Sequence, residues 1–330
     1  MRVLLAGHFT PRTYYGIMNK LAHGFIRLGH VVEFFDDRAV ARASTIFRSR
    51  KMGIAPMNKA LLETCRWFRP DFILLGHCKT VRNETLDGIR AMLPDVRMAY
   101  RNVDWLVVED NRKLIHQRTS HVDAIFSTTA GEALRQFAGK RASIHYMPNP
   151  VDRAIDTGRA FELQNQPFDV FYAIGGVSPG DTRPAFIADL KTLCPGVKFS
   201  VHGMNGAPHI FGAAYQEALL QARMGLNHSR ANDQYLYSSD RMAQYMGNGL
   251  LTFLDKDASF RELFTEEEAV FYEGTAELAD KLRFYADHDD ARRRVAEQGH
   301  QKIHQAWASE NVAQYLLDCS FGRPSKEWAW

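Results

Sequence analysis

Short apolar runs alternate along the chain with longer segments in which apolar residues recur every three or four positions. Residues 3–6 form the first aliphatic run, which ends at Gly7 as a central strand of a parallel sheet does. Helical periodicity follows over residues 17–28, and Gly29 stands where the end of a helix needs a left-handed residue. The next apolar run, residues 31–35, completes a strand–helix–strand unit, whose crossover we expect to be right-handed.

The same alternation predicts two parallel sheets. Strands of the first sheet are expected at residues 3–6, 31–35, 72–75, 96–100, 124–126 and 144–147. Strands of the second sheet are expected at residues 169–174, 197–201, 224–226, 250–254 and 269–272. Helical patterns in the second half cover residues 184–193, 215–223, 239–245, 275–286, 289–306 and 310–317. This repeated strand–helix order is typical of α/β domains in which helices cover both faces of a sheet.

A polar stretch without periodicity separates the two halves. We expect a Rossmann-like domain over residues 1–150, a linker over 151–167 and a second Rossmann-like domain over 168–308. The final segment, 309–330, is expected to be a helix and tail that cross back to the first domain. The predicted fold class is therefore α/β, with two doubly wound domains that face each other across a cleft.

Composition and charge narrow the function classes. The chain has 330 residues, 45% hydrophobic and 24% charged, which is typical of a globular protein with room for two domains. Lys and Arg number 41 against 38 Asp and Glu, an excess too small for a dedicated nucleic-acid-binding protein. The four cysteines form no CxxC pair, and no apolar run is long enough for a membrane-spanning helix or a secretory signal. These features favour a cytoplasmic protein without a disulfide scaffold.

Several common motifs are absent. The first strand-to-helix turn lacks GxGxxG, and Pro11 and Arg12 stand where a dinucleotide-binding turn needs small residues. The sequence contains neither a GxxxxGK[ST] phosphate-binding loop nor a Gly-x-Ser-x-Gly nucleophile motif. No cluster of His, Cys and carboxylates has metal-ligand spacing, and the Asp-x-Asp of Asp255 and Asp257 is expected in a strand-to-helix turn. We therefore expect no cofactor and no metal.

Ligands of parallel α/β sheets bind beyond the carboxyl ends of the strands, so the residues that follow each strand are the candidates. In the second half these residues suit a ligand with phosphates and hydroxyls. They are Gly175, Gly176, Arg183, His202, Asn205, Asn227, His228 and Ser229. Arg183 is equally compatible with an exposed helix start, and His202 with a structural role. In the first half, His8 and Asp104 follow strands and are the candidate catalytic residues, with a structural hydrogen-bonded role as the alternative.

The most informative pattern precedes the fourth strand of the second half. Ser238 and Ser239 are typical N-cap residues, and Asp240 favours the first turn of a helix. The N–H groups at a helix N-terminus attract a diphosphate, and Arg241 can add a bidentate contact to its oxygens. Gln244, three residues further on, lies on the same face as Arg241.

This segment resembles the donor-binding helix of GT-B glycosyltransferases of the CgeB-like (spore-maturation) group, which is related to glycosyltransferase family 4. The pattern of that group is roughly Arg-x-Phe-Glu-x-x-Ala-x-Gly, in which Arg241 matches the arginine, Gln244 the glutamate and Gly249 the last glycine. Other parts of the chain resemble the group in the same order, namely residues 28–36, 148–152, 215–229, 264–272 and 292–299.

The resemblance implies a GT-B fold and transfer of a sugar from a nucleotide-sugar donor to a glycan, lipid-linked saccharide or protein acceptor. It also implies independence of metal, with retention of anomeric configuration as one outcome. In that group the glutamate binds the donor ribose, whereas Gln244 keeps one acceptor, adds two donors and cannot act as a base. The Glu-x7-Glu pair of family 4 is missing, because Leu236 occupies its earlier position. A non-catalytic nucleotide- or sugar-binding protein, a nucleotide-sugar 2-epimerase and a Rossmann oxidoreductase therefore stay open as alternatives.

A basic stretch lies between the second and third expected strands. It contains Arg38, Arg42, Arg48, Arg50 and Lys51, with Ile46 and Phe47 interleaved. Such a stretch can bind the anionic inner face of a membrane and bring the protein near a lipid-linked acceptor. A solvated helix and loop face is the alternative interpretation.

Overall fold

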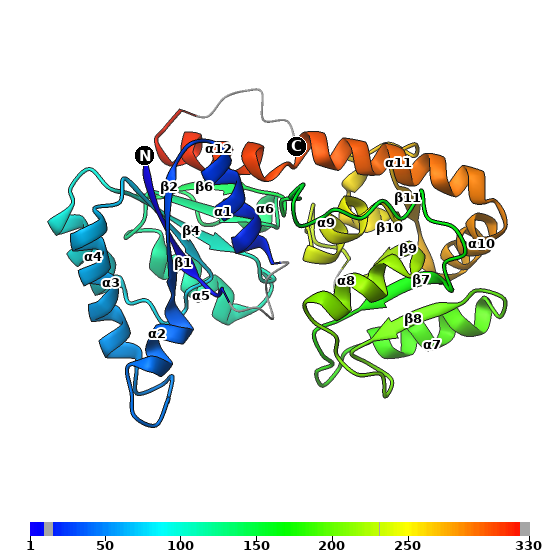
Figure 1. Cartoon of the computed structure of the whole chain (residues 1–330), viewed down its shortest axis with the longest axis horizontal. Coiled ribbons are helices and arrows are strands. Elements are labelled where there is room, and N and C mark those ends of the chain that lie inside the picture. Colours follow the sequence, from blue (N-terminus) through cyan, green and yellow to red (C-terminus); the bar gives the residue numbers. More distant parts are fainter. Residues whose placement is uncertain (10–15, 231, 324–330) are drawn as a thin grey trace. The chain divides into compact units, whose positions relative to one another are not determined.

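The computed structural model describes residues 1–9, 16–230 and 232–323. The chain divides into two compact units, the first made of Met1–Pro150 with Ser309–Trp330 and the second of Val151–Ala308 (Figure 1). Pro11 and Arg12, on which the argument against a dinucleotide-binding turn partly depends, lie outside the described residues.

The first unit contains a six-stranded parallel sheet with the order β2-β1-β3-β4-β5-β6. Its strands are β1 (Arg2–Gly7), β2 (Val31–Asp36), β3 (Phe72–Gly76), β4 (Arg97–Asn102), β5 (Ala124–Ser127) and β6 (Ser143–Tyr146). Its helices are α1 (Ile17–Arg27), α2 (Asp37–Ala43), α3 (Ile54–Phe68), α4 (Asn83–Met92), α5 (Glu109–Arg118), α6 (Glu132–Arg135) and α12 (Ser309–Ser320). The strand order reverses between β1 and β3, the switch point at which ligands of such sheets bind.

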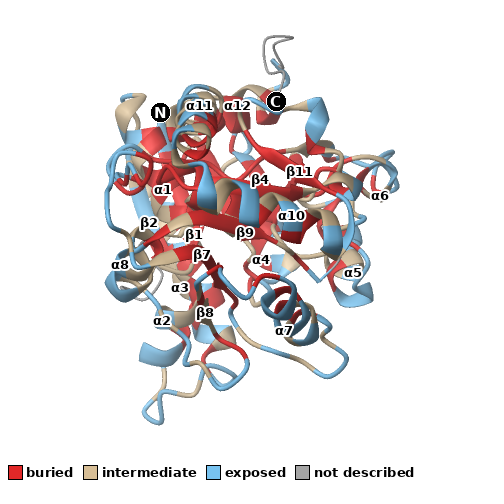
Figure 2. Cartoon of the chain, turned by 90° about the vertical axis from the view of Figure 1, so that its right-hand side faces the viewer, coloured by how far each residue is buried: buried red, intermediate tan, exposed pale blue. Residues whose placement is uncertain are grey.

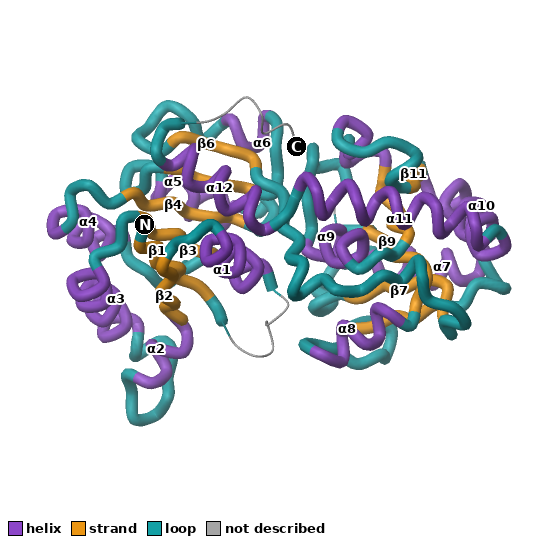
Figure 3. Tube along the Cα trace, turned by 45° about the horizontal axis from the view of Figure 1, so that its top comes forward, coloured by secondary structure: helices purple, strands orange, loops and turns teal. Residues whose placement is uncertain are grey.

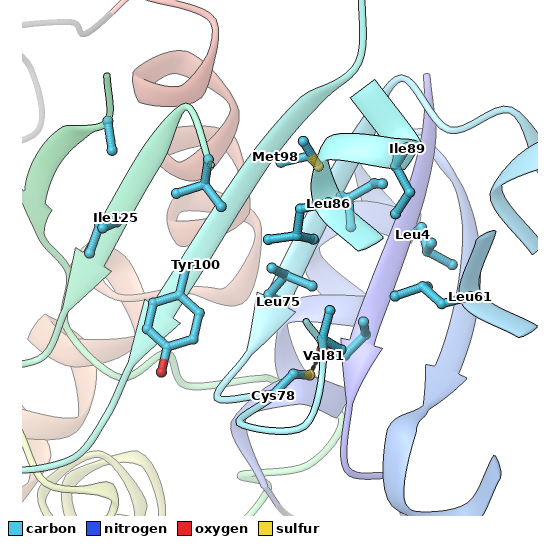
Figure 4. Close-up of a cluster of buried hydrophobic side chains, with 14 of the residues drawn as sticks. Leu4, Leu61, Leu75, Cys78, Val81, Leu86, Ile89, Met98, Tyr100 and Ile125 are labelled. Carbon is cyan, nitrogen blue, oxygen red and sulfur yellow. Dashed lines mark hydrogen bonds between the residues drawn. The ribbon is translucent and has the colours of Figure 1, made fainter. Parts of the chain in front are cut away.

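Helices cover both faces of this sheet (Figure 3). Within β1, Val3 faces one apolar cluster and Leu4 the other, which explains why the strand reads as a continuous apolar run. On one face α1 and α12 bury Phe25 and Leu316 against the strands. On the other face α3 and α4 pack against the sheet through residues that include Leu61 (Figure 4). The C-terminal helix therefore belongs to the core of the first unit.

The second unit contains a five-stranded parallel sheet with the order β11-β10-β9-β7-β8. Its strands are β7 (Phe168–Ala173), β8 (Phe199–His202), β9 (Ala222–Asn227), β10 (Leu251–Asp255) and β11 (Val270–Tyr272). Its α-helices are α7 (Arg183–Leu193), α8 (Ala213–Leu220), α9 (Asp240–Gly247), α10 (Gly274–Asp287) and α11 (Asp289–Ala306). Here the strand order reverses between β7 and β9.

The second sheet is also covered on both faces. Ile187 of α7, Leu278 of α10 and Val295 of α11 belong to one apolar cluster with the strands. Leu219 of α8 and Tyr245 of α9 belong to the cluster on the other face. Figure 2 shows the strands as buried, whereas the outer sides of α7 and α10 are exposed.

The predicted fold class is confirmed, since each expected strand forms within a sheet of the predicted half. The helix expected over residues 215–223 is wrong at its end, because α8 stops at Leu220 and the chain pairs with β7 from Ala222 onward. Arg223 therefore lies in β9, where its guanidinium forms an ion pair with Asp169. Within the described ranges, no helix has the length and apolar character needed to cross a membrane.

Candidate functional site

The N-terminus of α9 is fixed to the carboxyl end of β9. Ser239 is the N-cap of α9: its hydroxyl accepts the N–H of Met242 at 3.4 Å and donates to Oδ1 of Asn227 at 2.6 Å. Asn227 is the last residue of β9 and is buried. This hydrogen bond therefore sets the start of the helix at the switch point of the second sheet.

Arg241, in the first turn of α9, has its guanidinium in a defined position. One terminal nitrogen, Nη2, donates to the carbonyl oxygen of His228 and to the hydroxyl of Ser229, each at 2.9 Å. The guanidinium carbon lies 5.4 Å from the ring centre of Tyr172 on β7, which adds a cation–π contact. Nε is buried without a hydrogen-bond partner among the described residues. The other terminal nitrogen, Nη1, makes no hydrogen bond among the described residues, so the half-buried guanidinium keeps donor capacity for a ligand.

His228 supports this arrangement through its backbone and its ring. Its carbonyl oxygen accepts from Arg241 and also from the hydroxyl of Tyr172 at 2.7 Å. The ring stacks on Phe186 of α7, with 3.7 Å between ring centres and 7° between planes. Burial, with Arg241 close by, lowers the pKa of His228 to about 4, so the ring is neutral at pH 7. His228 is thus placed to position Arg241 rather than to offer a second cation.

Arg183 lies at the start of α7, and its guanidinium is already paired. It donates to both carboxylate oxygens of Asp181 and, at 3.1 Å, to the carbonyl oxygen of Gly176. The hydrogen bond from Arg183 lowers the pKa of Asp181 to about 2. Arg230 lies nearby, with its Nε 3.5 Å from the same carboxylate. Because Arg183 is buried and bonded within this loop, a direct contact with a leaving group stays a prediction.

The loop after β7 leaves open space next to this pair. A Cβ placed on Gly175 would meet no atom within 4 Å, and one on Gly176 would approach only His209, at 3.6 Å. Gly176 has φ +140°, a conformation that side chains rarely adopt. The two glycines therefore leave room for a ligand to approach the backbone.

The residues after β8 make local hydrogen bonds. His202 Nε2 lies 3.0 Å from the Ser200 hydroxyl, and burial lowers the pKa of this histidine. Asn205 has φ +52° and donates to the carbonyl oxygen of Pro184 at 3.2 Å. His202 thus bonds within β8 and Asn205 bonds to the start of α7, and their contact with a base or ribose stays a prediction.

The remaining predicted residues of α9 differ in burial. Ser238 is buried and Asp240 is exposed in the first turn. Gln244 is half-buried, and its side-chain amide has no hydrogen-bond partner within the ranges that the structure describes. Gly249, beyond the helix, has φ +76°, and a Cβ there would lie 2.6 Å from the ring of Phe161. The glycine at this position is therefore required by both conformation and packing.

In the first unit, two histidines flank the switch point. His8 follows β1 and His77 follows β3. His77 Nε2 lies 3.0 Å from Oδ2 of Asp104, and the Lys79 ammonium lies 3.6 Å from the same oxygen. The hydrogen bond with His77 lowers the pKa of Asp104. Asp104 is therefore ionised and paired at pH 7.

His8 is half-buried and, among the described residues, makes no hydrogen bond through its ring. Burial, followed by the charge of Arg38, lowers the pKa of His8, so the ring is neutral at pH 7. Asp36 at the end of β2 lies nearby, where its carboxylate accepts the N–H groups of Phe9 and Ala39 at 2.9 and 2.7 Å. His8 is thus a neutral imidazole at a fixed strand end.

Sequence reasoning missed two side chains of these two sites and assigned no role to two others that follow strands. The sequence pattern predicts Tyr172 as a core residue of a strand and Phe186 as a core residue of a helix. The contact of Tyr172 with Arg241, and that of Phe186 with His228, form only in the folded unit. Asp181 precedes Arg183 by two residues, a spacing that could have suggested their ion pair. His77 follows a strand as His8 does, and the same rule selects it, but no pattern in the sequence assigns it a role.

No group of three or more His, Cys, Asp or Glu side chains in the described part of the chain could hold a metal ion. The Asp-x-Asp is explained by local structure. Asp255 ends β10, and its carboxylate accepts the N–H of Asp257 at 3.1 Å, so that it caps a short 3-10 helix. The strand-to-helix turn predicted there is confirmed.

A family model matches part of the chain, from the start of α7 into α12. Residues 183–318 match the family model described as glycosyl transferase-like, a span that begins at Arg183 and includes all of α9. A comparison with curated proteins finds no match. The matched span contains most of the residues predicted to bind the donor.

Solved structures extend the similarity to nearly the whole chain. HepE from Anabaena, in complex with UDP and glucose, has a TM-score of 0.66 at 12% identity, covering 98% of this chain and 100% of that one. Sucrose-phosphate synthase from Thermosynechococcus elongatus has a TM-score of 0.64 at 10% identity, covering 98% of each chain. AviGT4, a glycosyltransferase involved in avilamycin A biosynthesis, has a TM-score of 0.61 at 14% identity, covering 97% of each. The fold is therefore that of GT-B glycosyltransferases, whereas the CgeB-like subgroup stays a prediction.

Proposed function

We propose that this protein is a glycosyltransferase that moves a sugar from a nucleotide-sugar donor to an acceptor hydroxyl. The observation that carries the proposal is the guanidinium of Arg241, which retains donor capacity at the N-terminus of α9 and at the switch point of the second sheet. The glycosyl transferase-like match over residues 183–318 supports it. HepE was solved with UDP and with UDP-glucose, so a uridine diphosphate sugar is the first donor to test.

In this proposal α9 binds the diphosphate of the donor. The N–H groups of its first turn and the Arg241 guanidinium offset the charge of the phosphates. The same groups stabilise the negative charge that builds on the leaving diphosphate as the glycosidic bond breaks. We therefore propose transfer without a metal ion. The resemblance to glycosyltransferase family 4 supports retention of configuration as part of the same proposal. Gln244, whose amide has no partner among the described residues, binds the ribose hydroxyls.

The carboxyl edge of the first sheet is proposed to bind the acceptor, which is a glycan, a lipid-linked saccharide or a protein. The neutral ring of His8 can accept a hydrogen bond from the acceptor hydroxyl. Asp104, held by His77, can orient that hydroxyl or stabilise a developing positive charge on the sugar. The proposed location is the cytoplasm, with contact to the inner face of a membrane through residues 38–51.

The test is a thermal-shift screen of the purified chain against UDP-, GDP-, CMP- and dTDP-sugars, followed by product analysis with and without acceptors. We expect one nucleotide-sugar class to raise the melting temperature and to transfer its sugar only when an acceptor is present. Binding without turnover on any acceptor would favour the non-catalytic alternative. A new nucleotide sugar formed without acceptor would indicate a 2-epimerase, and stabilisation by NAD(P)H alone an oxidoreductase.

A further inference from the structure

The segment between α2 and α3 is an ordered turn rather than an extended linker. The Thr45 hydroxyl accepts the N–H of Ser49 at 2.8 Å, and the N–H of Gly53 donates to the Ser49 carbonyl at 3.0 Å. Gly53 packs so closely on α2 that a Cβ there would lie 1.7 Å from the carbonyl oxygen of Ala41. The turn is thus fixed to α2 at a position that only glycine fits. In Figure 1 it projects beyond α2 and α3.

This turn presents large apolar side chains to solvent. Ile46 is 95% exposed, Phe47 81% and Met52 63%. By contrast, Met57 and Leu61 of the adjoining α3 are fully buried. Three strongly exposed apolar side chains on one ordered turn are typical of a surface that binds a membrane or an apolar partner.

Positive charge surrounds these apolar side chains. The five cations of the segment are Arg38, Arg42, Arg48, Arg50 and Lys51. Residues 38–51 contain no acidic residue, and none of the five cations forms an ion pair with a carboxylate in the described part of the chain. The acids that precede them are occupied: Asp36 caps α2, and the buried carboxylate of Asp37 accepts a hydrogen bond from Thr80 at 2.8 Å. The surface is therefore complementary to an anionic partner.

We infer that residues 38–53 form a docking surface for an anionic phospholipid bilayer. Ile46, Phe47 and Met52 insert among the acyl chains near the headgroups, while the flanking cations contact lipid phosphates. The apolar side chains favour a bilayer over a nucleic acid. Acyl chains would remove the exposed Ile46 side chain from water, whereas a phosphate backbone would not.

The position of the turn connects this surface with the acceptor. β1 and β2 run toward the side of the first unit on which α2 and the turn lie, and His8 follows β1 (Figure 1). A bilayer docked there would lie on the side that carries His8. On the basis of the proposed function, the acceptor class is then a saccharide or other hydroxyl carried by a membrane lipid.

The experiment is sedimentation of the full chain with vesicles of phosphatidylcholine alone or mixed with phosphatidylglycerol, at low and high salt. We expect binding to the mixed vesicles that weakens with salt, and little binding to phosphatidylcholine alone. The double variants Ile46→Ser/Phe47→Ser and Arg48→Glu/Arg50→Glu should each weaken binding by about tenfold or more. All four side chains are exposed, so the melting temperature should be unchanged.

Two controls localise the effect to the turn. Lys113→Glu/Arg135→Glu makes the same change in net charge at exposed sites on α5 and α6, and Trp67→Ser removes an 83% exposed ring at the far end of α3. Both should bind vesicles as the unmodified chain does. The inference is overturned if the unmodified chain does not bind the mixed vesicles. The same holds if the control variants lose as much binding as the variants of the turn. It is also overturned if only the charge variant matters and heparin competes fully, which would indicate a nonspecific polyanion site.

The same variants separate this inference from sugar transfer. Thermal shifts with the nucleotide sugar should be unchanged in Ile46→Ser/Phe47→Ser, because the turn lies in the first unit and α9 in the second. Vesicle binding without any transfer would count against the proposed function alone. Transfer without vesicle binding would count against the docking surface alone.

Discussion

The carboxyl edges of the two sheets differ in chemistry although both belong to parallel sheets whose strand order reverses next to the first strand. In the second unit, side chains at this edge are bonded to one another and hold Arg241 in place. In the first unit, the edge carries a neutral His8 without a ring hydrogen bond among the described residues, and the His77–Asp104 pair. The second edge thus suits a charged group held in one orientation, and the first suits an uncharged hydroxyl.

This difference shows that the strand order determines where a ligand binds, whereas the side chains at that edge determine which ligand fits. Both switch points follow from strand order alone. In the second unit a capped helix with an arginine in its first turn begins at that point. The following four variants separate the edges, from the largest expected effect to the smallest.

Replacing Arg241 with alanine should weaken UDP binding by about tenfold to a hundredfold, because a charge-assisted contact to the diphosphate is lost. Uridine binding should change little, since it contains no phosphate. Calorimetric titration of UDP and uridine measures both, and Arg283→Ala, an exposed arginine on α10, is the matched control. Equal losses for UDP and uridine would contradict the diphosphate assignment.

Asp181→Asn should destabilise the second unit by about 2 kcal/mol at pH 7, because the pKa of Asp181 is held at about 2 by Arg183, below its ordinary value. A lowered carboxyl pKa stabilises the fold above the unfolded pKa and loses this effect as the pH falls toward 2. The difference in melting temperature between the variant and the original chain should therefore shrink between pH 4 and pH 2. The control Asp280→Asn removes an exposed ion pair and should change the melting temperature little.

Asp104→Asn tests the first edge. The variant should lower the rate of sugar transfer by about tenfold while leaving the donor KM unchanged, because the carboxylate acts on the acceptor side. Initial-rate kinetics at varied donor and acceptor concentrations measure this, with Asp110→Asn on α5 as an exposed control. A rise in donor KM with an unchanged rate would show that Asp104 has no acceptor-side role.

Gln244→Glu should have the smallest effect, a gain of about threefold in affinity for UDP and uridine alike, since a carboxylate accepts more hydrogen bonds from ribose hydroxyls. The parallel change in both ligands distinguishes it from Arg241→Ala. Gln117→Glu, an exposed residue of the first unit, controls for net charge. If neither affinity changes, Gln244 does not contact the ribose.

Strands were the most predictable part of the fold. Both faces of most strands are buried, so these strands appear in the sequence as continuous apolar runs. Such runs are rare in loops, which makes the strands easy to predict. Helix α5 was missed because it buries Asn111 and Arg118 beside Ile115 and carries little apolar periodicity. Helix α3 does repeat apolar residues at Met57, Leu61 and Cys65, but it was not assigned.

The candidate site divides in the same way. Ser239 and Arg241 were predictable because capping and helix position are local properties of the sequence. The ring of Tyr172 under Arg241, and that of Phe186 on His228, bring together segments distant in sequence. The pairing of Arg183 with Asp181 shows the limit of residue type alone, because a predicted ligand contact is also a buried structural ion pair.

Helix α12 has a consequence for how the chain matures. Leu316 and Val312 of this helix belong to the core of the first unit, which otherwise ends at Pro150. A ribosome therefore releases the whole second unit before the last apolar face of the first sheet can be covered. Until then the apolar surface that α12 covers stays exposed on the nascent first unit, and a pause of translation within α10 or α11 prolongs that exposure.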